Sequence, residues 1–184
     1  MKLFSQILHK KGVMLFLATA LFFVSCESNF KEVQKINITE LNPVGEAQDF
    51  NLKYTDSGKI KAVLVSPQML DFSHLEFPFT EFPKGINVTI YDDAGNQNFV
   101  TSKYAISYAV SNIIELQGQV VITTHDGKKL ETEQLYYDQK NEWFFTQKPF
   151  RFIDRGSVIN GVGIDFSKDF KNLDTQQING TYSL

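Results

Sequence analysis

The sequence predicts an all-β fold built from stacked repeats of about 30 residues. Apolar and polar side chains alternate over short stretches, which is typical of strands with one buried face. Tight-turn signals separate these stretches, and the same order of strand, turn and strand recurs along the chain. Beyond Gly85, no apolar pattern with helical spacing runs for more than about two turns.

Residues 1–25 are predicted to be a signal peptide rather than part of the fold. Lys2, Lys10 and Lys11 form a basic head, and residues 12–24 form an apolar run. That run is too short to span a bilayer comfortably but matches the core of a signal peptide.

The only cysteine of the chain, Cys26, directly follows Phe23-Val24-Ser25. This arrangement resembles a bacterial lipobox, in which the thiol is acylated and the chain is cut before the cysteine. Cys26 is therefore the predicted lipidation site and mature N-terminus. The alternatives are a plain secretory signal with an incidental cysteine and an uncleaved anchor helix.

Residues 26–49 are predicted to be a lipidated tether, because they are polar and are broken by Pro43 and Gly45. The remaining residues, 50–184, match the size of one domain. With Cys26 consumed by lipid no disulfide can form, so the core must hold the domain together, and 17 Phe residues supply apolar area for it. The formal charge of −3 argues against a nucleic-acid partner.

The alternation of the domain begins at Phe50 and turns at Ser57-Gly58, which is a loose first copy of the repeat. Residues 75–85 carry three Phe among Pro and Gly and are expected to pack as a flap or an extended edge. The second copy turns at residues 93–95 and the fourth at Arg155-Gly156.

The third copy, residues 116–146, is the clearest. It alternates from Val120, turns at Asp126-Gly127 and resumes on the other side. Asp-Gly supplies the positive-φ positions that a tight hairpin needs. The alternation then shifts by one residue between Thr132 and Leu135, which predicts a bulge or corner. Two apolar rows per copy predict two facing sheets around one interior, with the first and last strands left unpaired.

No constellation for catalysis or for a cofactor is present. His74 and His125 have no cysteine or second histidine nearby, which argues against a zinc site. The serines lack the surroundings of an activated nucleophile, and Gly161-Val-Gly163 lacks the strand-to-helix context of a phosphate loop. The sequence therefore predicts that the protein is not an enzyme and needs no cofactor or metal.

Taken together in their order and spacing, these motifs resemble the lipopolysaccharide-transport periplasmic proteins of the LptC and LptA type, the OstA-like family. The resemblance runs from about Phe50 to Gly180. It is carried by Leu116-Gln-Gly118, Asp126-Gly127, residues 130–137, residues 161–166 and Ile178-x-Gly180. It implies a half-open antiparallel β-jelly roll, or β-taco, whose trough takes the acyl chains of lipopolysaccharide. A single repeat domain behind an N-terminal signal looks more like the LptC type.

The resemblance implies an apolar lining for the trough, drawn from the alternating rows. The predicted lipid-binding residues are Phe99, Ile106, Tyr108, Leu116, Val120, Ile122, Leu130, Leu135, Tyr137, Trp143, Phe145, Phe150, Phe152, Ile164 and Phe166. For each of them the alternative is a place in a dry core.

Topology and resemblance together imply two partner edges. Ile178 and Tyr182 belong to the predicted strand that pairs with a periplasmic bridge protein of the LptA type. Phe50, Leu52 and Tyr54 belong to the opposite edge, which faces the inner-membrane ABC transporter. The expected location is the periplasm, anchored by the N-terminal lipid, with the inner membrane favoured over the outer.

Three other functions are consistent with parts of the pattern. A structural scaffold lipoprotein without lipid cargo would have a filled interior. A closed, lipocalin-like carrier of a small apolar ligand would have sealed edges. An envelope hydrolase would need the catalytic constellation that the sequence does not offer.

Overall fold

The computed structural model describes residues 42–181, and all regular structure in this part of the chain is β-strand. The strands are β1 (Gly45–Asp56), β2 (Lys59–Asp71), β3 (Phe79–Phe82), β4 (Ile86–Tyr91), β5 (Gln97–Ser102), β6 (Tyr104–Tyr108), β7 (Ile113–Thr123), β8 (Lys129–Asp138), β9 (Trp143–Asp154), β10 (Ser157–Ser167) and β11 (Leu173–Thr181). The all-β prediction is confirmed. The first strand begins at Gly45, ahead of the Phe50 at which the domain was expected to start.

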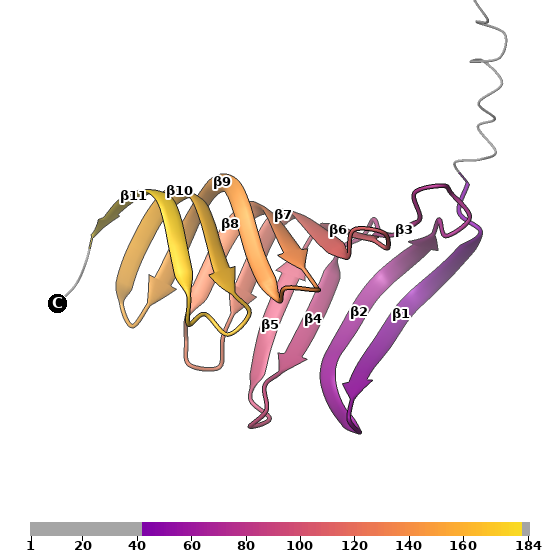
Figure 1. Ribbon diagram of the computed structural model, residues 1–184, viewed down its shortest axis with the longest axis horizontal. Coiled ribbons are helices and arrows are strands. Elements are labelled where there is room, and N and C mark those ends of the chain that lie inside the picture. Colours follow the sequence, from indigo (N-terminus) through magenta and orange to yellow (C-terminus); the bar gives the residue numbers. More distant parts are fainter. Residues whose placement is uncertain (1–41, 182–184) are drawn as a thin grey trace, which may run out of the picture. The chain divides into compact units, whose positions relative to one another are not determined.

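The strands form one antiparallel sheet that divides into two halves (Figure 1). β7 pairs with β6 through residues 113–117 and with β5 through residues 121–123. β2 likewise pairs with β4 through residues 62–65 and with β3 at residues 70–71. Each long strand therefore contributes one part to the half that contains β3 and β6 and the other part to the half that contains β4 and β5.

The pairing of neighbouring strands shifts register between the two halves of the sheet. The change in the alternation between Thr132 and Leu135 predicted such an irregularity in β8. Register shifts fall between Gln117 and Val120 in β7 and between Thr132 and Tyr136 in β8. Gly118 and Gln119 both adopt positive φ, at 71° and 47°. Two consecutive residues with positive φ bend a strand sharply. Glycine adopts a positive φ without strain because it has no Cβ.

Buried hydroxyl groups support the bend. The Ser66 hydroxyl lies 2.8 Å from the carbonyl oxygen of Gly85 in the neighbouring strand. The Thr132 hydroxyl lies 2.9 Å from the carbonyl oxygen of Pro149 in the same way. Ser66 is fully buried and Thr132 is 7% exposed, so these hydrogen bonds satisfy polar groups that have little access to water.

The four predicted tight turns are all present. Ser57-Gly58 joins β1 to β2, residues 93–95 join β4 to β5, Asp126-Gly127 joins β7 to β8, and Arg155-Gly156 joins β9 to β10. The glycines in these turns have φ between 75° and 89°. A residue with a Cβ is strained there, so the turn chemistry in the sequence sets where the hairpins close.

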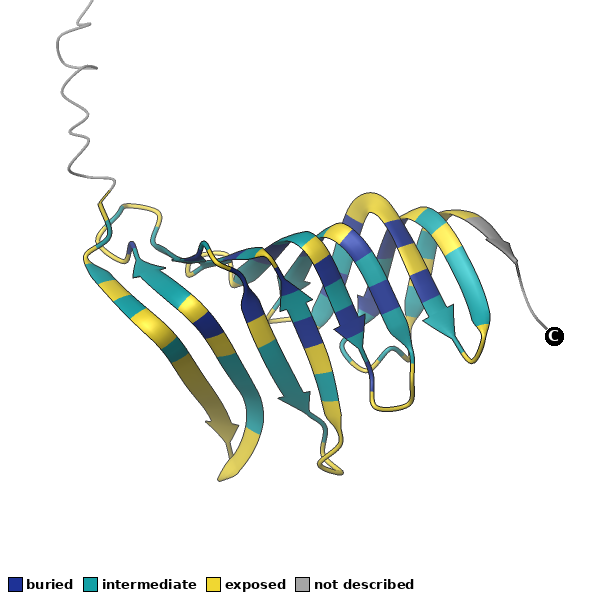
Figure 2. Cartoon of the chain, turned by 180° about the vertical axis from the view of Figure 1, so that it is seen from behind, coloured by how far each residue is buried: buried dark blue, intermediate teal, exposed yellow. Residues whose placement is uncertain are grey.

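The inward faces of the two halves form one hydrophobic core that is densest around β7 to β10 (Figure 2). Leu116, Leu135, Ile164 and Phe166 are each at most 2% exposed. Burial falls toward β1 and β2, where residues 51–60 are all exposed. The interior is therefore packed around β7 to β10 and open at the β1–β2 side, which we call the open end.

Candidate functional site

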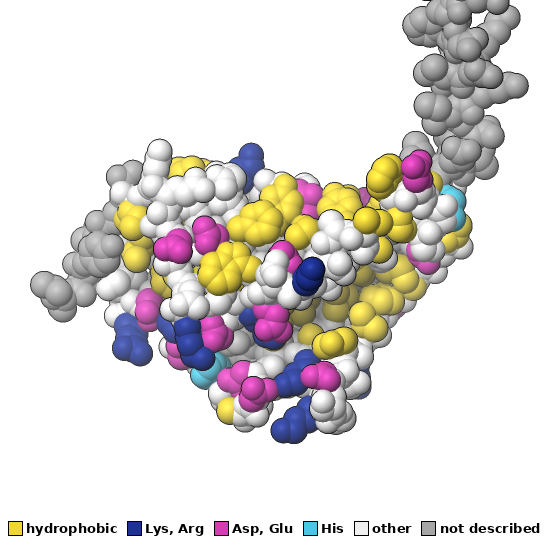
Figure 3. Space-filling model, viewed as in Figure 1, with side chains coloured by type: hydrophobic (Ala, Val, Ile, Leu, Met, Phe, Trp, Pro, Cys, Tyr) yellow, Lys and Arg dark blue, Asp and Glu magenta, His cyan; other side chains and the backbone are white. Residues whose placement is uncertain are grey.

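A cavity of about 380 Å³ lies between the two halves of the sheet at the open end. Leu52, Ala62, Leu64, Val88, Ile90 and Val100 line it from one half, and Ile114, Leu116, Tyr137 and Phe144 from the other. Figure 3 shows apolar side chains gathered in this region, with charged side chains along the lower edge. The cavity has the size of a small-ligand site and a mostly apolar wall.

The strand register builds the apolar wall from one continuous series of side chains, which we call the inner row. In each pair of neighbouring strands, the members of the row are directly opposite one another. The row comprises Leu52, Leu64, Val88, Val100, Ile122, Leu130, Phe152 and Ile159. Opposite side chains on the same face of a sheet are in contact, so the row is unbroken from β1 to β10.

Exposure is highest at the β1 end of the inner row and lowest in its middle. Leu52 is 50% exposed, whereas Val100 is 3% and Leu130 is 1% exposed. The same apolar surface is thus accessible at the open end and covered in the middle of the sheet.

Stacked aromatic rings fill the interior beyond the cavity. Tyr137 stacks on Phe144 with ring centroids 4.4 Å apart, and Phe144 stacks on Phe166 at 5.2 Å. Phe170, from the loop between β10 and β11, adds a further ring 4.6 Å from Phe166 and 6.2 Å from Phe152. Because this stack occupies the space between the halves, the cavity ends there.

Two ion pairs stand at the mouth of the cavity. Lys61 lies 2.6 Å from Asp93, and Lys168 lies 2.7 Å from Glu142. The hydrogen bond from Lys61 holds the pKa of Asp93 below its usual range. Burial, with a smaller effect of nearby Glu142, raises the pKa of Tyr137 to about 12, so this phenol stays neutral inside the cavity at neutral pH. An apolar interior with a charged rim suits an amphiphilic ligand.

Ten of the predicted lining residues face the interior. Nine of these are at most 7% exposed, and Tyr137 is half-buried: Leu116, Val120, Ile122, Leu130, Leu135, Tyr137, Phe150, Phe152, Ile164 and Phe166. Only Leu116 and Tyr137 among them line the cavity. The others are packed core, so the open cavity lies nearer the N-terminal strands than the sequence indicated.

The structure places the other five predicted lining residues on the outer face: Phe99, Ile106, Tyr108, Trp143 and Phe145. In β9 the inward ring is Phe144, which pairs with Tyr137, and its neighbours therefore point outward. The alternation of one strand does not fix the phase of the next strand across a connecting turn, such as residues 139–142 between β8 and β9, so the sequence reading selected the other face for these residues. The half-buried lining residues that the sequence reading missed are Ala62, Leu64, Val88, Ile90 and Ile114, which belong to the same alternation in β2, β4 and β7.

The outward aromatic residues are bound into a polar network. The Tyr108 hydroxyl donates to Glu115 at 3.2 Å, and the Gln117 amide donates to the same carboxylate at 2.7 Å. Tyr136 stacks on Phe145 with centroids 5.2 Å apart, and burial raises the pKa of Tyr108. These contacts give the outer-face residues a structural role that does not need lipid.

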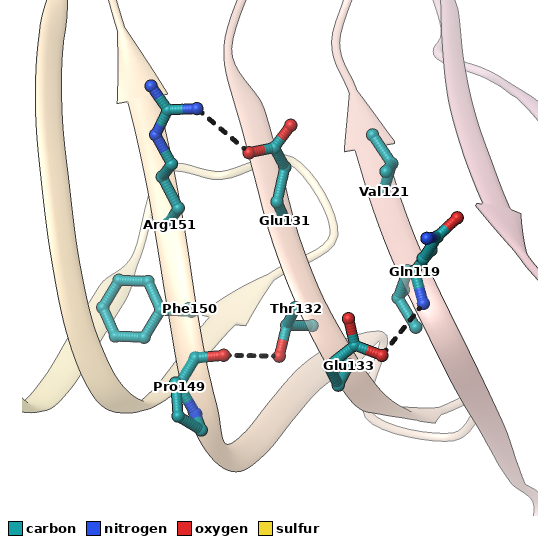
Figure 4. Close-up of a pocket in the computed structure, with 9 residues that line it drawn as sticks. Gln119, Val121, Glu131, Thr132, Glu133, Pro149, Phe150 and Arg151 are labelled. Atoms are coloured by element: carbon teal, nitrogen blue, oxygen red, sulfur yellow. Dashed lines mark hydrogen bonds and ion pairs between the residues drawn. The ribbon is translucent and has the colours of Figure 1, made fainter.

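A second hollow, of about 500 Å³, lies over the bulges on the outer face (Figure 4). Arg151 is 3.3 Å from Glu131, and the Gln119 backbone amide donates to Glu133 at 3.3 Å. The hydrogen bond from Lys129, and then that from Arg151, lowers the pKa of Glu131. Arg151 and Glu131 are thus paired with each other, and Glu133 is bound by a backbone amide. Within residues 42–181, no group of histidine, cysteine and acidic side chains could hold a metal ion.

The predicted partner edges lie at the two ends of the sheet. β1 pairs with β2, and β11 pairs with β10, with no further strand beside either in the described part. Phe50 packs on Phe82 with centroids 5.9 Å apart, while Leu52 and Tyr54 line the cavity. Ile178 is 47% exposed on β11. Tyr182, Cys26 and the predicted signal peptide lie outside the described residues.

A comparison with protein families finds a match over most of the chain. The family described as "LptC: Lipopolysaccharide-assembly, LptC-related" matches residues 13–182. The comparison with curated proteins finds no match. No helix in the part of the chain that the structure describes is long and apolar enough to cross a membrane.

Proposed function

The chain belongs to the LptC-related family of lipopolysaccharide-assembly proteins, and from this premise we propose how it takes part in lipopolysaccharide transport. In this proposal it is the periplasmic component that receives lipid from the inner-membrane ABC transporter. It holds the acyl chains in the cavity at the open end and passes them to a bridge protein of the LptA type. Lipidation at Cys26 would keep it at the membrane.

The observation that carries this proposal is the inner row. A 12-carbon acyl chain left in water would cost on the order of 10 kcal/mol, at about 0.8 kcal/mol per methylene. A carrier therefore has to offer apolar contact throughout the transfer. The inner row offers it without interruption and is accessible at Leu52, where the chain can enter.

The charged rim of the cavity supports binding with the acyl chains inside and the polar head of the lipid outside. Lys61 and Lys168 lie at the mouth, and the apolar side chains lie behind them. A lipid that inserts its acyl chains would leave its polar head near these side chains. The cavity would bind the apolar part of the ligand, and the head would remain in water.

Photo-crosslinking in cells tests the proposal. A photoreactive amino acid at Leu64, which lines the cavity, is expected to form an adduct with lipopolysaccharide while export is running. The matched control is Val65, the next residue, which is 41% exposed on the opposite face of β2. Equal labelling at both positions, or none at either, would contradict the proposal.

A structural scaffold is the second candidate function. The packed interior around β7 to β10 favours it, since Leu135 and Phe166 are fully buried. A scaffold would give protein adducts at the edge strands and no lipid adduct at Leu64. The experiment above therefore separates the two candidates.

A further inference from the structure

Exposed apolar side chains gather at the end of the sheet where the chain enters β1. Phe77 and Val110, at 75% and 69% exposed, are the most exposed large apolar residues in the described part, and Val44 is 58% exposed. Their segments are joined by the backbone. Val44 donates to Asp71 at 2.8 Å, next to the β2–β3 loop, and Ala109 donates to Pro78 of that loop at 3.1 Å.

The β2–β3 loop is held firmly at its base. Phe72, which is 7% exposed, stacks on Phe79 with centroids 4.5 Å apart, and its backbone amide donates to the Phe79 carbonyl at 3.0 Å. The Ser73 amide donates to the Asp71 carboxylate at 2.8 Å, which fixes the start of the loop. With its base closed by the Phe72–Phe79 stack, the loop presents Phe77 to the surroundings.

The chain that precedes β1 limits what can lie near this end. Residues 12–24 are an apolar run, and Cys26 follows it. Whether the run stays in the bilayer or Cys26 carries lipid, the chain leaves the membrane near residue 26. Residues 27–41 can then reach at most about 50 Å when extended, and about 20 Å on average when flexible. Because the described domain begins at residue 42, Val44 and its neighbours belong to the end of the domain that this chain segment ties to the bilayer.

We propose that Val44, Phe77 and Val110 form a membrane-facing patch that inserts into the interfacial region of a phospholipid bilayer. The inference rests on the membrane anchorage in the proposed function but not on lipopolysaccharide as cargo. Projecting apolar side chains suit this partner because a bilayer accepts single side chains at its interface. A stable protein interface, in contrast, generally buries more than about 1,000 Å².

The charges near the patch indicate which force attracts it to the bilayer. Asp71 and Glu76 are acidic, and the β2–β3 loop contains no lysine or arginine. Contact with the bilayer must then come from apolar insertion and not from attraction to anionic head groups. It should persist at about 0.5 M salt, where electrostatic attraction at the surface is largely screened.

The test uses the full chain in its own membrane. A benzophenone amino acid replaces Phe77 or Val110, and mass spectrometry identifies the adducts formed on illumination. Phospholipid adducts are expected at both positions. The controls are Phe99 and Ile178, which are 44% and 47% exposed on β5 and β11, and only background is expected there. Protein adducts alone at Phe77, no adduct, or equal phospholipid labelling at all four positions would overturn the proposal.

A second variant tests whether the patch acts as a unit. Phe77→Asp places a charge in the patch on an exposed loop, so the fold should be retained. With the probe at Val110, this change is expected to reduce the phospholipid adduct strongly, and Phe77→Leu to preserve it. An unchanged adduct in Phe77→Asp would show that Val110 meets lipid for another reason. The lipopolysaccharide adduct at Leu64 is scored separately, so loss of one signal is distinguishable from loss of the other.

Discussion

At the scale of single residues, the direction of each aromatic side chain decides its role. Phe144 and Phe145 are neighbours in β9, yet Phe144 is 3% exposed in the core stack and Phe145 stacks on Tyr136 outside. The pleat alternates the faces, so a shift of one residue in the assumed phase moves a side chain from the core to the outer face. Substitutions at paired positions on the two faces should therefore have very different effects.

Phe166→Ala should destabilise the fold by about 3–5 kcal/mol, because it empties the centre of the aromatic stack. Phe166 is fully buried between Phe144 and Phe170. Phe145→Ala, the matched control on the outer face, should cost clearly less. Urea denaturation of both variants measures the difference. Equal losses would mean that the outer face is packed as tightly as the core.

Tyr137 should make stability fall at high pH. Its pKa in the fold is raised from 10.0 to about 12 by burial, so the folded state favours the neutral phenol. The resulting stabilisation is fully present below pH 10 and is lost as the pH rises through about 12. Tyr137→Phe cannot ionise and should lose less stability between these pH values than the unaltered protein. A parallel decline in both proteins would contradict the assignment.

At the scale of elements, the hairpins and the bulge in β8 follow from local sequence patterns, whereas the bend in β7 does not. Asp126-Gly127 and Arg155-Gly156 were sufficient to place two turns, because Gly127 and Gly156 take up the positive φ at which these hairpins close. The bend at Gln119 depends on how β7 and β8 pair along their full length, which a single strand's alternation does not reveal. The fold class was therefore predictable, whereas the face of Trp143 and Phe145 was not, because the alternation of β8 does not fix the phase of β9 across the turn at residues 139–142.

The close packing at the bend requires a residue without a Cβ at position 85, which is Gly85. A Cβ at this position would lie 2.3 Å from the Ser102 carbonyl oxygen, in addition to the strain of a φ of 83°. Gly95 has a similar φ of 86° but no atom within 4 Å of the added Cβ. Gly95→Ala should thus cost about 1–2 kcal/mol from backbone strain alone.

Gly85→Ala should cost substantially more, since the neighbouring backbone must also move. Thermal unfolding of the two variants side by side separates the clash from the strain. If they lose the same stability, the strands at the bend can separate at little cost, and the close packing there does not hold the halves together.

At the scale of the whole molecule, one apolar interior serves two purposes. The aromatic stack around Phe144, Phe166 and Phe170 supplies cohesion at one side, and the open end leaves the same inner row accessible. A domain without disulfides needs the cohesion of the aromatic stack, and a lipid carrier needs the accessible inner row. Stability and lipid uptake should then respond separately to changes at the two sides.

Leu64→Trp tests this separation. The larger side chain would occupy part of the 380 Å³ cavity without entering the packed core. Uptake of lipopolysaccharide by the full chain is expected to fall sharply, because an acyl chain and the indole ring compete for the same space. The melting temperature should change little, since the added ring fills empty space and buries apolar surface.

Val65→Trp, on the opposite face of β2, is the control and should leave uptake unchanged. Loss of uptake in both variants would mean that bulk anywhere on β2 interferes, and the cavity would lose its special role. Full uptake in Leu64→Trp would place the lipid elsewhere on the protein. Only a selective loss, with the fold intact, assigns the open end of the inner row to the acyl chain.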